Sequence, residues 1–180
     1  TSSLHLTSPE TELYISSPLV DDFIKNFVIS TFEKSRFVLS FGGREVIFNI
    51  QFAEVLPSPM FYETMNFYLS TPMVLSTKRI FNDELKQYYL RQDDKDLIDR
   101  ILYQNLQNKY KLLYKKESSE SELSLKWDND FLLKKKNRIT KKVTINENGM
   151  YPIDIIGLQA PFKIKASPEL LQVGYECGFG

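Results

Sequence analysis

One amphipathic stripe between positions 97 and 113 constrains the fold of this chain more than any other feature. Its apolar residues recur every three or four positions, which is the spacing of one face of an α-helix. They are Leu97, Ile98, Ile101, Leu102, Leu106, Tyr110 and Leu113. Asp93 and Asp94 directly precede the stripe and are typical of a helix start. We therefore predict one long helix here, with Asn82 or Asp83 capping an earlier helical stretch.

Most other apolar segments alternate with polar residues, which predicts strands. Residues 37–41 and 46–52 alternate on either side of Gly42 and Gly43, so they predict a β-hairpin with a two-glycine turn. Further short strands are expected at residues 12–15, 65–69, 139–145, 153–155 and 162–164. Asn148 and Gly149 predict the turn between two of these strands.

Two Ser-Pro pairs predict helix starts, because serine caps a helix and proline suits its first turn. They are Ser17-Pro18, followed by Asp21 and Asp22, and Ser167-Pro168. The resulting element order predicts an α+β chain with two tandem ferredoxin-like (RRM-like) units and antiparallel sheets, the first unit incomplete. The proline-rich break at residues 56–59 predicts domains at 1–57 and 58–180.

Composition excludes several classes of protein. Hydrophobic residues make up 42% of the 180 positions, which is globular rather than disordered. No apolar run is long enough for a membrane span, so we expect no membrane partner. The single cysteine, Cys177, excludes an internal disulfide and fits a reducing compartment, so a cytoplasmic location is expected. The chain begins at Thr1 and stops at a glycine-rich run, so we expect missing flanks on both sides.

Charge is unevenly distributed, although 23 basic and 23 acidic residues give a formal net charge of zero. Residues 78–142 hold 17 basic and 11 acidic side chains, a net of +6. Within them, the basic segment Phe131–Lys142 has no acidic residue. Its cations are Lys134, Lys135, Lys136, Arg138, Lys141 and Lys142. Two interpretations stay open: a localised polyanion site on or beside a hairpin, or a solvated loop whose lysines aid solubility.

Few side chains suggest catalysis. His5 is the sole histidine, and its position at the start of a strand or a frayed end favours a structural role. Cys177 has no evident base to activate it as a nucleophile. Asp93, Asp94, Asp96 and Asp99 resemble a metal cluster in composition, but their helical spacing favours capping and solvent exposure. We therefore expect no metal and no organic cofactor.

The last residues form a glycine-rich tail, Gly174–Gly180, after the short helix that starts at Pro168. Glycine lacks a Cβ and tolerates positive φ, so such a backbone can approach a phosphate closely. Tyr175 in this tail suits either stacking on a base or packing beneath the loop. The tail and the basic segment together are the candidate site of this sequence.

The order of these motifs resembles one known family. Residues 167–180 resemble the glycine-rich motif of the RAMP superfamily, and more narrowly that of CRISPR-associated endoribonucleases of the Cas-six type. Residues 55–59 and 67–74 are similar to that family's linker and its Ser-Pro-Ile strand. Residues 14–18, an acidic helix and the hairpin at 37–52 are similar to the end of its N-terminal domain. The second half of the glycine-rich loop is absent after Gly180.

The resemblance implies metal-independent cleavage of CRISPR repeat RNA, in which a ribose 2′-hydroxyl attacks the adjacent phosphate and leaves a 2′,3′-cyclic phosphate. The family's catalytic histidine lies upstream of the region that matches here, so the role is not carried over to His5 and the catalytic residues stay unknown. The resemblance assigns RNA contact to Gly178, Phe179 and Gly180, with Gly174 less securely. Charge alone assigns phosphate contacts to the six cations of the basic segment.

Two other functions remain open. A non-catalytic RNA-binding RAMP subunit of a CRISPR effector complex, with other CRISPR-associated proteins as partners, has the same basic segment and glycine-rich tail. A ferredoxin-like protein-interaction module has an incidental run of lysines and predicts no salt-sensitive binding of RNA.

Overall fold

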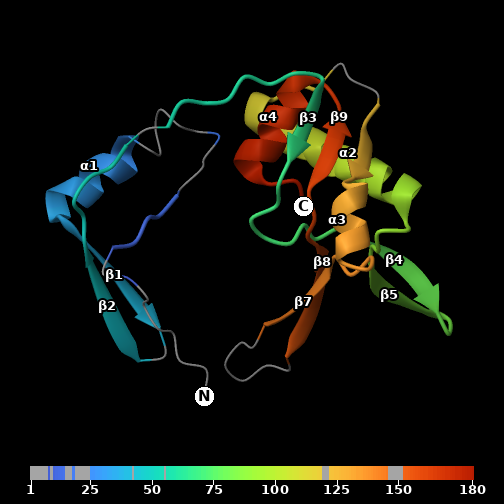
Figure 1. The fold of residues 1–180 in the computed structure, drawn as a ribbon, viewed down its shortest axis with the longest axis horizontal. Coiled ribbons are helices and arrows are strands. Elements are labelled where there is room, and N and C mark those ends of the chain that lie inside the picture. The colour runs from blue at the N-terminus through green and yellow to red at the C-terminus, as the bar shows by residue number, and fades with distance from the viewer. Residues whose placement is uncertain are drawn as a thin grey trace. The chain divides into compact units, whose positions relative to one another are not determined.

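The computed structural model describes residues 8, 10–14, 18, 25–41, 43–54, 56–118, 122–145 and 152–180. Backbone contacts divide the chain into two compact units, Thr1–Leu56 and Pro57–Gly180. Helices and antiparallel strands are mixed along the described residues (Figure 1), so the predicted α+β class is confirmed.

The first unit contains a helix and a hairpin. Helix α1 (Lys25–Lys34) leads through Ser35 into strands β1 (Arg36–Phe41) and β2 (Arg44–Asn49). The strands pair antiparallel with Phe37 opposite Phe48, which confirms the predicted hairpin. Gly43 has a φ of +74°, a left-handed conformation that glycine adopts without steric cost and that the tight turn uses.

The N-terminal part of the first unit differs from the sequence prediction. The strand expected at residues 12–15 is wrong for Glu12–Tyr14, which lie outside any strand and are exposed. Three alternating residues are too few to form a stable strand without a partner. Ile15, the last residue of that predicted strand, lies outside the described residues, as do Ser17, Asp21 and Asp22 of the predicted helix start and Gly42 of the predicted turn.

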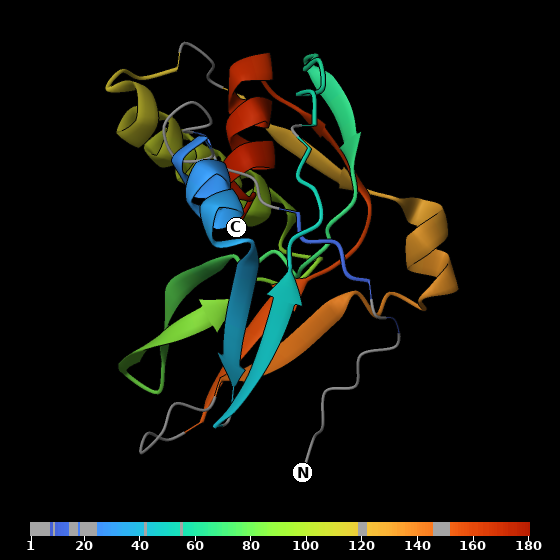
Figure 2. The same cartoon turned by 90° about the vertical axis from the view of Figure 1, so that its left-hand side faces the viewer.

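The second unit is built on a three-stranded antiparallel sheet. Its strands are β3 (Thr64–Phe67), β6 (Ser124–Trp127) and β9 (Phe162–Lys165), in the order β3-β9-β6. Helices α2 (Lys95–Tyr114) and α4 (Pro168–Cys177) lie on the same side of this sheet in Figure 2. The order β3-α2-β6-β9-α4 follows the first five elements of a ferredoxin-like β-α-β-β-α-β unit. Strand β6 escaped prediction because its four residues carry only two alternating apolar side chains.

Two hairpins and a short helix extend from this sheet. Strands β4 (Ser76–Phe81) and β5 (Glu84–Tyr89) form one hairpin, and β7 (Thr140–Ile145) and β8 (Ile153–Leu158) form the other. Helix α3 (Asn129–Lys134) precedes β7. The predicted turn at Asn148 and Gly149 lies outside the described residues.

The helical stretch expected after Asn82 or Asp83 is wrong. These residues form the two-residue turn of the β4–β5 hairpin, with φ of 50° and 60°. Asparagine and aspartate favour helix caps, but they also tolerate left-handed backbone better than most residues. A two-residue turn with both central residues left-handed matches the twist of a hairpin, and this competing preference prevails here.

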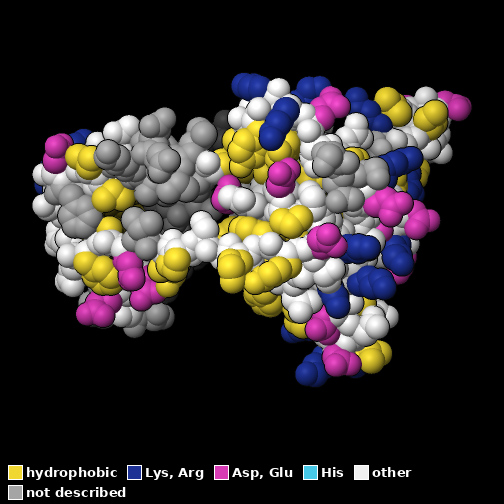
Figure 3. Space-filling view, turned by 90° about the horizontal axis from the view of Figure 1, so that it is seen from above, with side chains coloured by type: hydrophobic (Ala, Val, Ile, Leu, Met, Phe, Trp, Pro, Cys, Tyr) yellow, Lys and Arg dark blue, Asp and Glu magenta, His cyan; other side chains and the backbone are white. Residues whose placement is uncertain are grey.

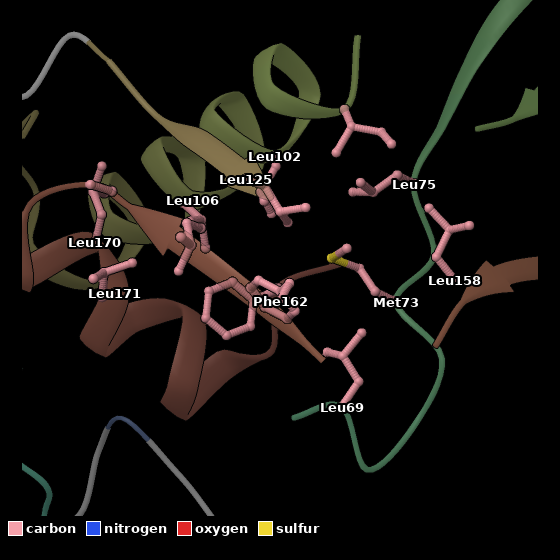
Figure 4. Close-up of a cluster of buried hydrophobic side chains, with 14 of the residues drawn as sticks. Leu69, Met73, Leu75, Leu102, Leu106, Leu125, Leu158, Phe162, Leu170 and Leu171 are labelled. Atoms are coloured by element: carbon pink, nitrogen blue, oxygen red, sulfur yellow. The ribbon is translucent and has the colours of Figure 1, made fainter. Parts of the chain in front are cut away.

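The buried hydrophobic residues of the described chain all lie in the second unit. Figure 4 shows Leu102 and Leu106 of α2 facing Phe162 of β9, with Leu170 and Leu171 of α4 beside them. The predicted stripe is therefore confirmed, since its other members are buried or pack against this cluster. Among the helices that the structure describes, none is both long and apolar enough to cross a bilayer.

The starts of α2 and α4 follow the sequence prediction. Asp94 is the N-cap residue of α2, although its side chain makes no capping hydrogen bond. At α4 the hydroxyl of Ser167 accepts a hydrogen bond from the Leu170 amide at 3.4 Å, with Pro168 in the first turn. Burial of the apolar faces of α2 and α4 in the core holds the two helices in place and thereby positions the glycine-rich tail.

Candidate nucleic-acid interface

The basic segment runs along α3, the turn after it and the first half of β7. Its six cationic side chains are all exposed. Among the described residues, one of them forms an ion pair, Lys142 with Asp154 at 2.7 Å. On the face in Figure 3, lysine and arginine side chains are numerous on the second unit, whereas acidic and apolar side chains prevail on the first.

Part of the basic segment is helical, which the sequence did not predict. Lys141 and Lys142 lie on the β7–β8 hairpin, as expected, but Phe131–Lys134 belong to α3. The side chain of Asp128 starts this helix by accepting a hydrogen bond from the Phe131 amide at 2.8 Å. The six-residue helix is too short to show helical periodicity in the sequence.

The end of α3 fixes the conformation of the next residues. The Asn137 amide donates to the Leu132 carbonyl at 2.8 Å, and the Lys136 amide donates to the Leu133 carbonyl at 3.0 Å. This pair of hydrogen bonds is the Schellman pattern, which places a left-handed residue just after the helix. Lys136 occupies that position with a φ of 49°, where glycine is the usual residue. Lys135, Lys136 and Arg138 are therefore presented by a defined turn.

A pocket of about 160 Å³ lies beside the basic segment. Its walls come from the end of β3, from α3, from β7 and from the turn after β8. The lining residues are Tyr68, Phe131, Lys135, Arg138, Lys141, Gln159 and Ala160. Tyr68 is 71% exposed, whereas Phe131 packs against the core. The Gln159 side-chain amide donates to the carbonyls of Leu69 and Ser70, both at 3.2 Å, and so ties the residues after Tyr68 to this turn.

Tyr68 and Gln159 were not predicted from the sequence as members of this site. A signal for Tyr68 was present, because in the alternating run of residues 65–69 it takes the position that faces away from the core. No sequence signal points to Gln159, which meets the basic segment only through the fold.

In the glycine-rich tail, Gly174 and Gly180 are needed for internal packing. Gly174 lies within α4, and a Cβ there would collide with the ring of Phe179. That ring is 6% exposed and packs edge-on against Phe67 and Phe162, with centroids 4.8 and 5.3 Å apart. A Cβ on Gly180 would lie 2.8 Å from the Val74 amide nitrogen. The ring of Phe179 is therefore part of the core and is not available to a ligand.

The other two residues of the tail are more open. Gly178 has a φ of +81°, and a Cβ there would meet no atom within 4 Å. The positive φ alone therefore explains why glycine occupies position 178. Tyr175 is half exposed, and its ring meets Phe61 edge-on at 5.7 Å. This contact leaves part of the Tyr175 ring in solvent.

Lys109 of α2 holds the carbonyl groups of the tail. Its ammonium donates to the carbonyls of Gly178 at 2.6 Å and Gly180 at 2.7 Å, and to that of Cys177 at 3.4 Å. Burial lowers the pKa of Lys109, an effect that Cys177 partly opposes. The sequence analysis missed this residue, although a lysine three positions after Leu106 on an apolar helix face was a usable signal.

The other candidate chemistry of the sequence finds little support in the structure. Burial raises the pKa of the Cys177 thiol, an effect that Lys109 partly opposes, and a raised pKa does not favour a nucleophilic thiolate. In the described part of the chain, no three histidine, cysteine, aspartate or glutamate side chains converge as metal ligands. His5 lies outside the described residues.

The larger pocket of the second unit has the wrong charge for a polyanion. It encloses about 510 Å³, and its acidic side chains include Glu63, Asp99 and Glu122. The Asp99 carboxylate accepts a hydrogen bond from the Leu125 amide at 2.9 Å, and burial raises the pKa of Asp99. Arg100 and Lys165 supply the cations there, so the basic segment remains the better candidate for binding phosphates.

The fold and the exposed basic segment together define a small α+β protein with a candidate surface for a polyanion. The solved structures that share the fold include the following three. A Cas6-related protein from Pyrococcus furiosus matches with a TM-score of 0.69 and 21% identity over 92% of this chain and 60% of that one. A structure described as CRISPR associated protein Cas6 matches with a TM-score of 0.62 and 24% identity over the same two shares. A RAMP protein described as binding different RNA substrates has a TM-score of 0.56 and 16% identity over 89% of this chain and 62% of that one.

The family is established by the sequence itself. The family model of the C-terminal part of CRISPR associated protein Cas6 matches residues 56–180, which is more than half of the chain. The chain therefore belongs to the Cas6 family of CRISPR-associated proteins. It spans about three fifths of the length of the solved structures that it matches. No curated protein matches the sequence.

Proposed function

We propose that this chain is part of a Cas6-type endoribonuclease that binds and cleaves CRISPR repeat RNA to give mature guide RNAs. The observation that carries the proposal is the coincidence of two features in one unit. The Cas6 family match covers residues 56–180, and the same residues present an exposed basic segment. In the proposed arrangement residues 1–57 are the remainder of an N-terminal ferredoxin-like domain, and residues 58–180 form the C-terminal one.

The charges of the basic segment suit a phosphate backbone. Among the described residues, Lys134, Lys135, Lys136, Arg138 and Lys141 form no ion pair. Cations without acidic partners are available to phosphates, and their binding releases counterions from the RNA. Placement on a capped helix, a defined turn and a paired strand gives these charges a fixed spacing, which a solvated loop would not have.

The proposed role of the glycine-rich tail is to shape the surface near the RNA. Packing of Gly174 against Phe179, and of Gly180 against Val74, holds the tail close to the sheet. Lys109 engages three tail carbonyls and so fixes the direction of the peptide groups around Gly178. In the proposed complex Gly174, Gly178, Phe179 and Gly180 thus contribute backbone shape rather than side-chain contacts.

The proposed reaction needs no metal. The ribose 2′-hydroxyl attacks the adjacent phosphate and the 5′-oxygen leaves, which gives a cyclic phosphate and a 5′-hydroxyl. A base must take the 2′-hydroxyl proton and an acid must protonate the leaving oxygen. The described residues of the second unit supply cations for the developing negative charge, while the acid and the base remain unassigned.

The RAMP protein described as binding different RNA substrates supports one alternative, an RNA-binding subunit that does not cleave. The test uses end-labelled repeat RNA from the organism's own CRISPR array, incubated with the full-length protein in EDTA. Cleavage at a single site with a cyclic phosphate product supports the endoribonuclease. Salt-sensitive binding without cleavage overturns it in favour of the RNA-binding subunit. Absence of both overturns both and leaves the protein-interaction module.

A further inference from the structure

The pocket beside α3 combines an exposed aromatic ring with cations, and the charge of the basic segment does not explain the ring. Tyr68 is 71% exposed at the end of β3. An aromatic side chain so exposed contributes little to folding, since most of its apolar surface stays in water. Among the described residues its hydroxyl has no hydrogen-bond partner that would explain the position. The ring is thus free to contact a ligand.

The remaining walls of the pocket suit the other parts of a nucleotide. Arg138 and Lys141 are exposed cations without ion pairs among the described residues, and cations of this kind bind phosphate. Lys135 lies over the ring of Phe131, 5.8 Å from its centroid, and closes the side of the pocket formed by α3. The side-chain amide of Gln159 donates hydrogen bonds to the carbonyls of Leu69 and Ser70. These bonds hold the backbone next to Tyr68 in place.

The size of the pocket selects the form of RNA. A volume of about 160 Å³ is below the roughly 300–1,000 Å³ of pockets that take drug-sized ligands. Its size suits a single base rather than a larger ligand. A base inside a duplex has no free face, because its neighbours cover both sides, whereas an unpaired base stacks readily on an aromatic ring.

We propose that this pocket binds one unpaired nucleotide of the RNA, with its base stacked on Tyr68 and its phosphate held by Arg138 and Lys141. The inference rests on the proposed function, because it assumes that RNA reaches the basic segment. It adds a preference for single-stranded over duplex RNA, which charge alone cannot give. Single-stranded RNA gains the stacking contact, and duplex RNA of the same length does not.

The test compares the affinities of the full-length protein and its variants for a labelled single-stranded RNA and for a duplex of the same length. Tyr68→Ala should weaken single-strand binding between about fivefold and about a hundredfold, the range for one lost base–aromatic stack. Tyr68→Phe should stay close to the unmodified protein, because it keeps the ring. Tyr62→Ala is the matched control, since Tyr62 is also exposed, at 59%, and does not line the pocket.

A second measurement locates the base directly. The fluorescence of 2-aminopurine, placed in turn at each position of the single strand, should be quenched at one position in the unmodified protein. That quenching should vanish in Tyr68→Ala. If Tyr68→Ala binds both RNAs as tightly as the unmodified protein, or weakens both equally, the nucleotide pocket is overturned. In either case cleavage of repeat RNA at a single site by the unmodified protein leaves the proposed function standing, whereas no RNA binding at all removes both proposals.

Discussion

Lys109 and Gly178 lie 69 positions apart in the chain, yet the ammonium of one donates a hydrogen bond to the carbonyl of the other at 2.6 Å. The same ammonium reaches the carbonyls of Cys177 and Gly180. One side chain of α2 thus binds three carbonyl groups between Cys177 and Gly180, at the end of α4. These carbonyls follow a helix C-terminus, where the helix dipole also favours a cation.

Replacement of Lys109 by methionine should destabilise the second unit by about 1–2 kcal/mol, because hydrogen bonds from a charged donor are lost, although water can reach the exposed Gly178 and Gly180 carbonyls. Urea denaturation measures the change in the free energy of unfolding. Lys111→Met is the matched control on the same helix, because Lys111 forms an exposed ion pair with Glu117 of little energetic value. Equal losses in the two variants would contradict the anchoring role of Lys109.

Asp94 should make stability depend on pH in acid solution. Burial by itself raises the pKa of Asp94. Hydrogen bonds from the Arg91 amide at 2.8 Å, the Tyr88 hydroxyl at 2.9 Å and the Arg79 guanidinium at 3.0 Å outweigh burial and hold the pKa below its usual 3.8. Because the folded pKa is lowered, the stabilisation is complete above about pH 3.8. It is lost as the pH falls through the folded value.

Asp94→Asn should therefore lower the Tm at pH 7 by an amount equivalent to about 1 kcal/mol, and this difference should shrink below pH 4. Thermal unfolding of both proteins between pH 7 and pH 3 measures it. Asp83→Asn is the control, since Asp83 is an exposed turn residue and asparagine also tolerates its left-handed φ of 60°. A difference between Asp94→Asn and the unmodified protein that stays constant down to pH 3 would falsify the assignment.

A local sequence pattern is sufficient to predict the longer elements of this fold. The helix at residues 95–114 and the hairpin at 36–49 were predictable, because each carries a long periodic pattern with its own start or turn signal. The β4–β5 hairpin was not, because Asn82 and Asp83 suit a helix cap and a left-handed turn equally well. Strand β6 and helix α3 are shorter than the window in which a period can be recognised.

The candidate site likewise has one part that could be predicted from the sequence and one part that could not. The cations of the basic segment were predictable because they are contiguous in the sequence. The pocket was not, since Tyr68 and Gln159 meet Arg138 only after β3, β7 and β8 have been placed by the fold. Nor could the sequence show that Gly174 and Phe179 require one another, because a glycine motif does not reveal which neighbour fills the space of the absent Cβ.

Gly174→Ala should destabilise the second unit by about 1–3 kcal/mol, because the added methyl group collides with the Phe179 ring inside a packed core. Phe179→Ala alone should cost about 3–5 kcal/mol through the cavity that it leaves. In the double variant the methyl group has room, so the combined loss should be smaller than the sum of the two single losses. Denaturation of all four proteins measures this coupling, and additive losses would show that the two residues act independently.

Lys136→Gly should separate RNA affinity from stability. Lys136 has a φ of 49° at the position after α3 where glycine is favoured, so the substitution removes the strain of a lysine in the left-handed backbone conformation. The Tm should stay unchanged or rise, although one cation of the basic segment is removed. If Lys136 contacts a phosphate, RNA affinity should fall and the slope of log affinity against log salt should become shallower by about 0.7. The control variant is Lys126→Ala, because Lys126 is an exposed lysine on β6 outside the basic segment. An unchanged affinity and slope in Lys136→Gly would remove Lys136 from the proposed interface, while a loss of Tm would contradict the strain at this turn.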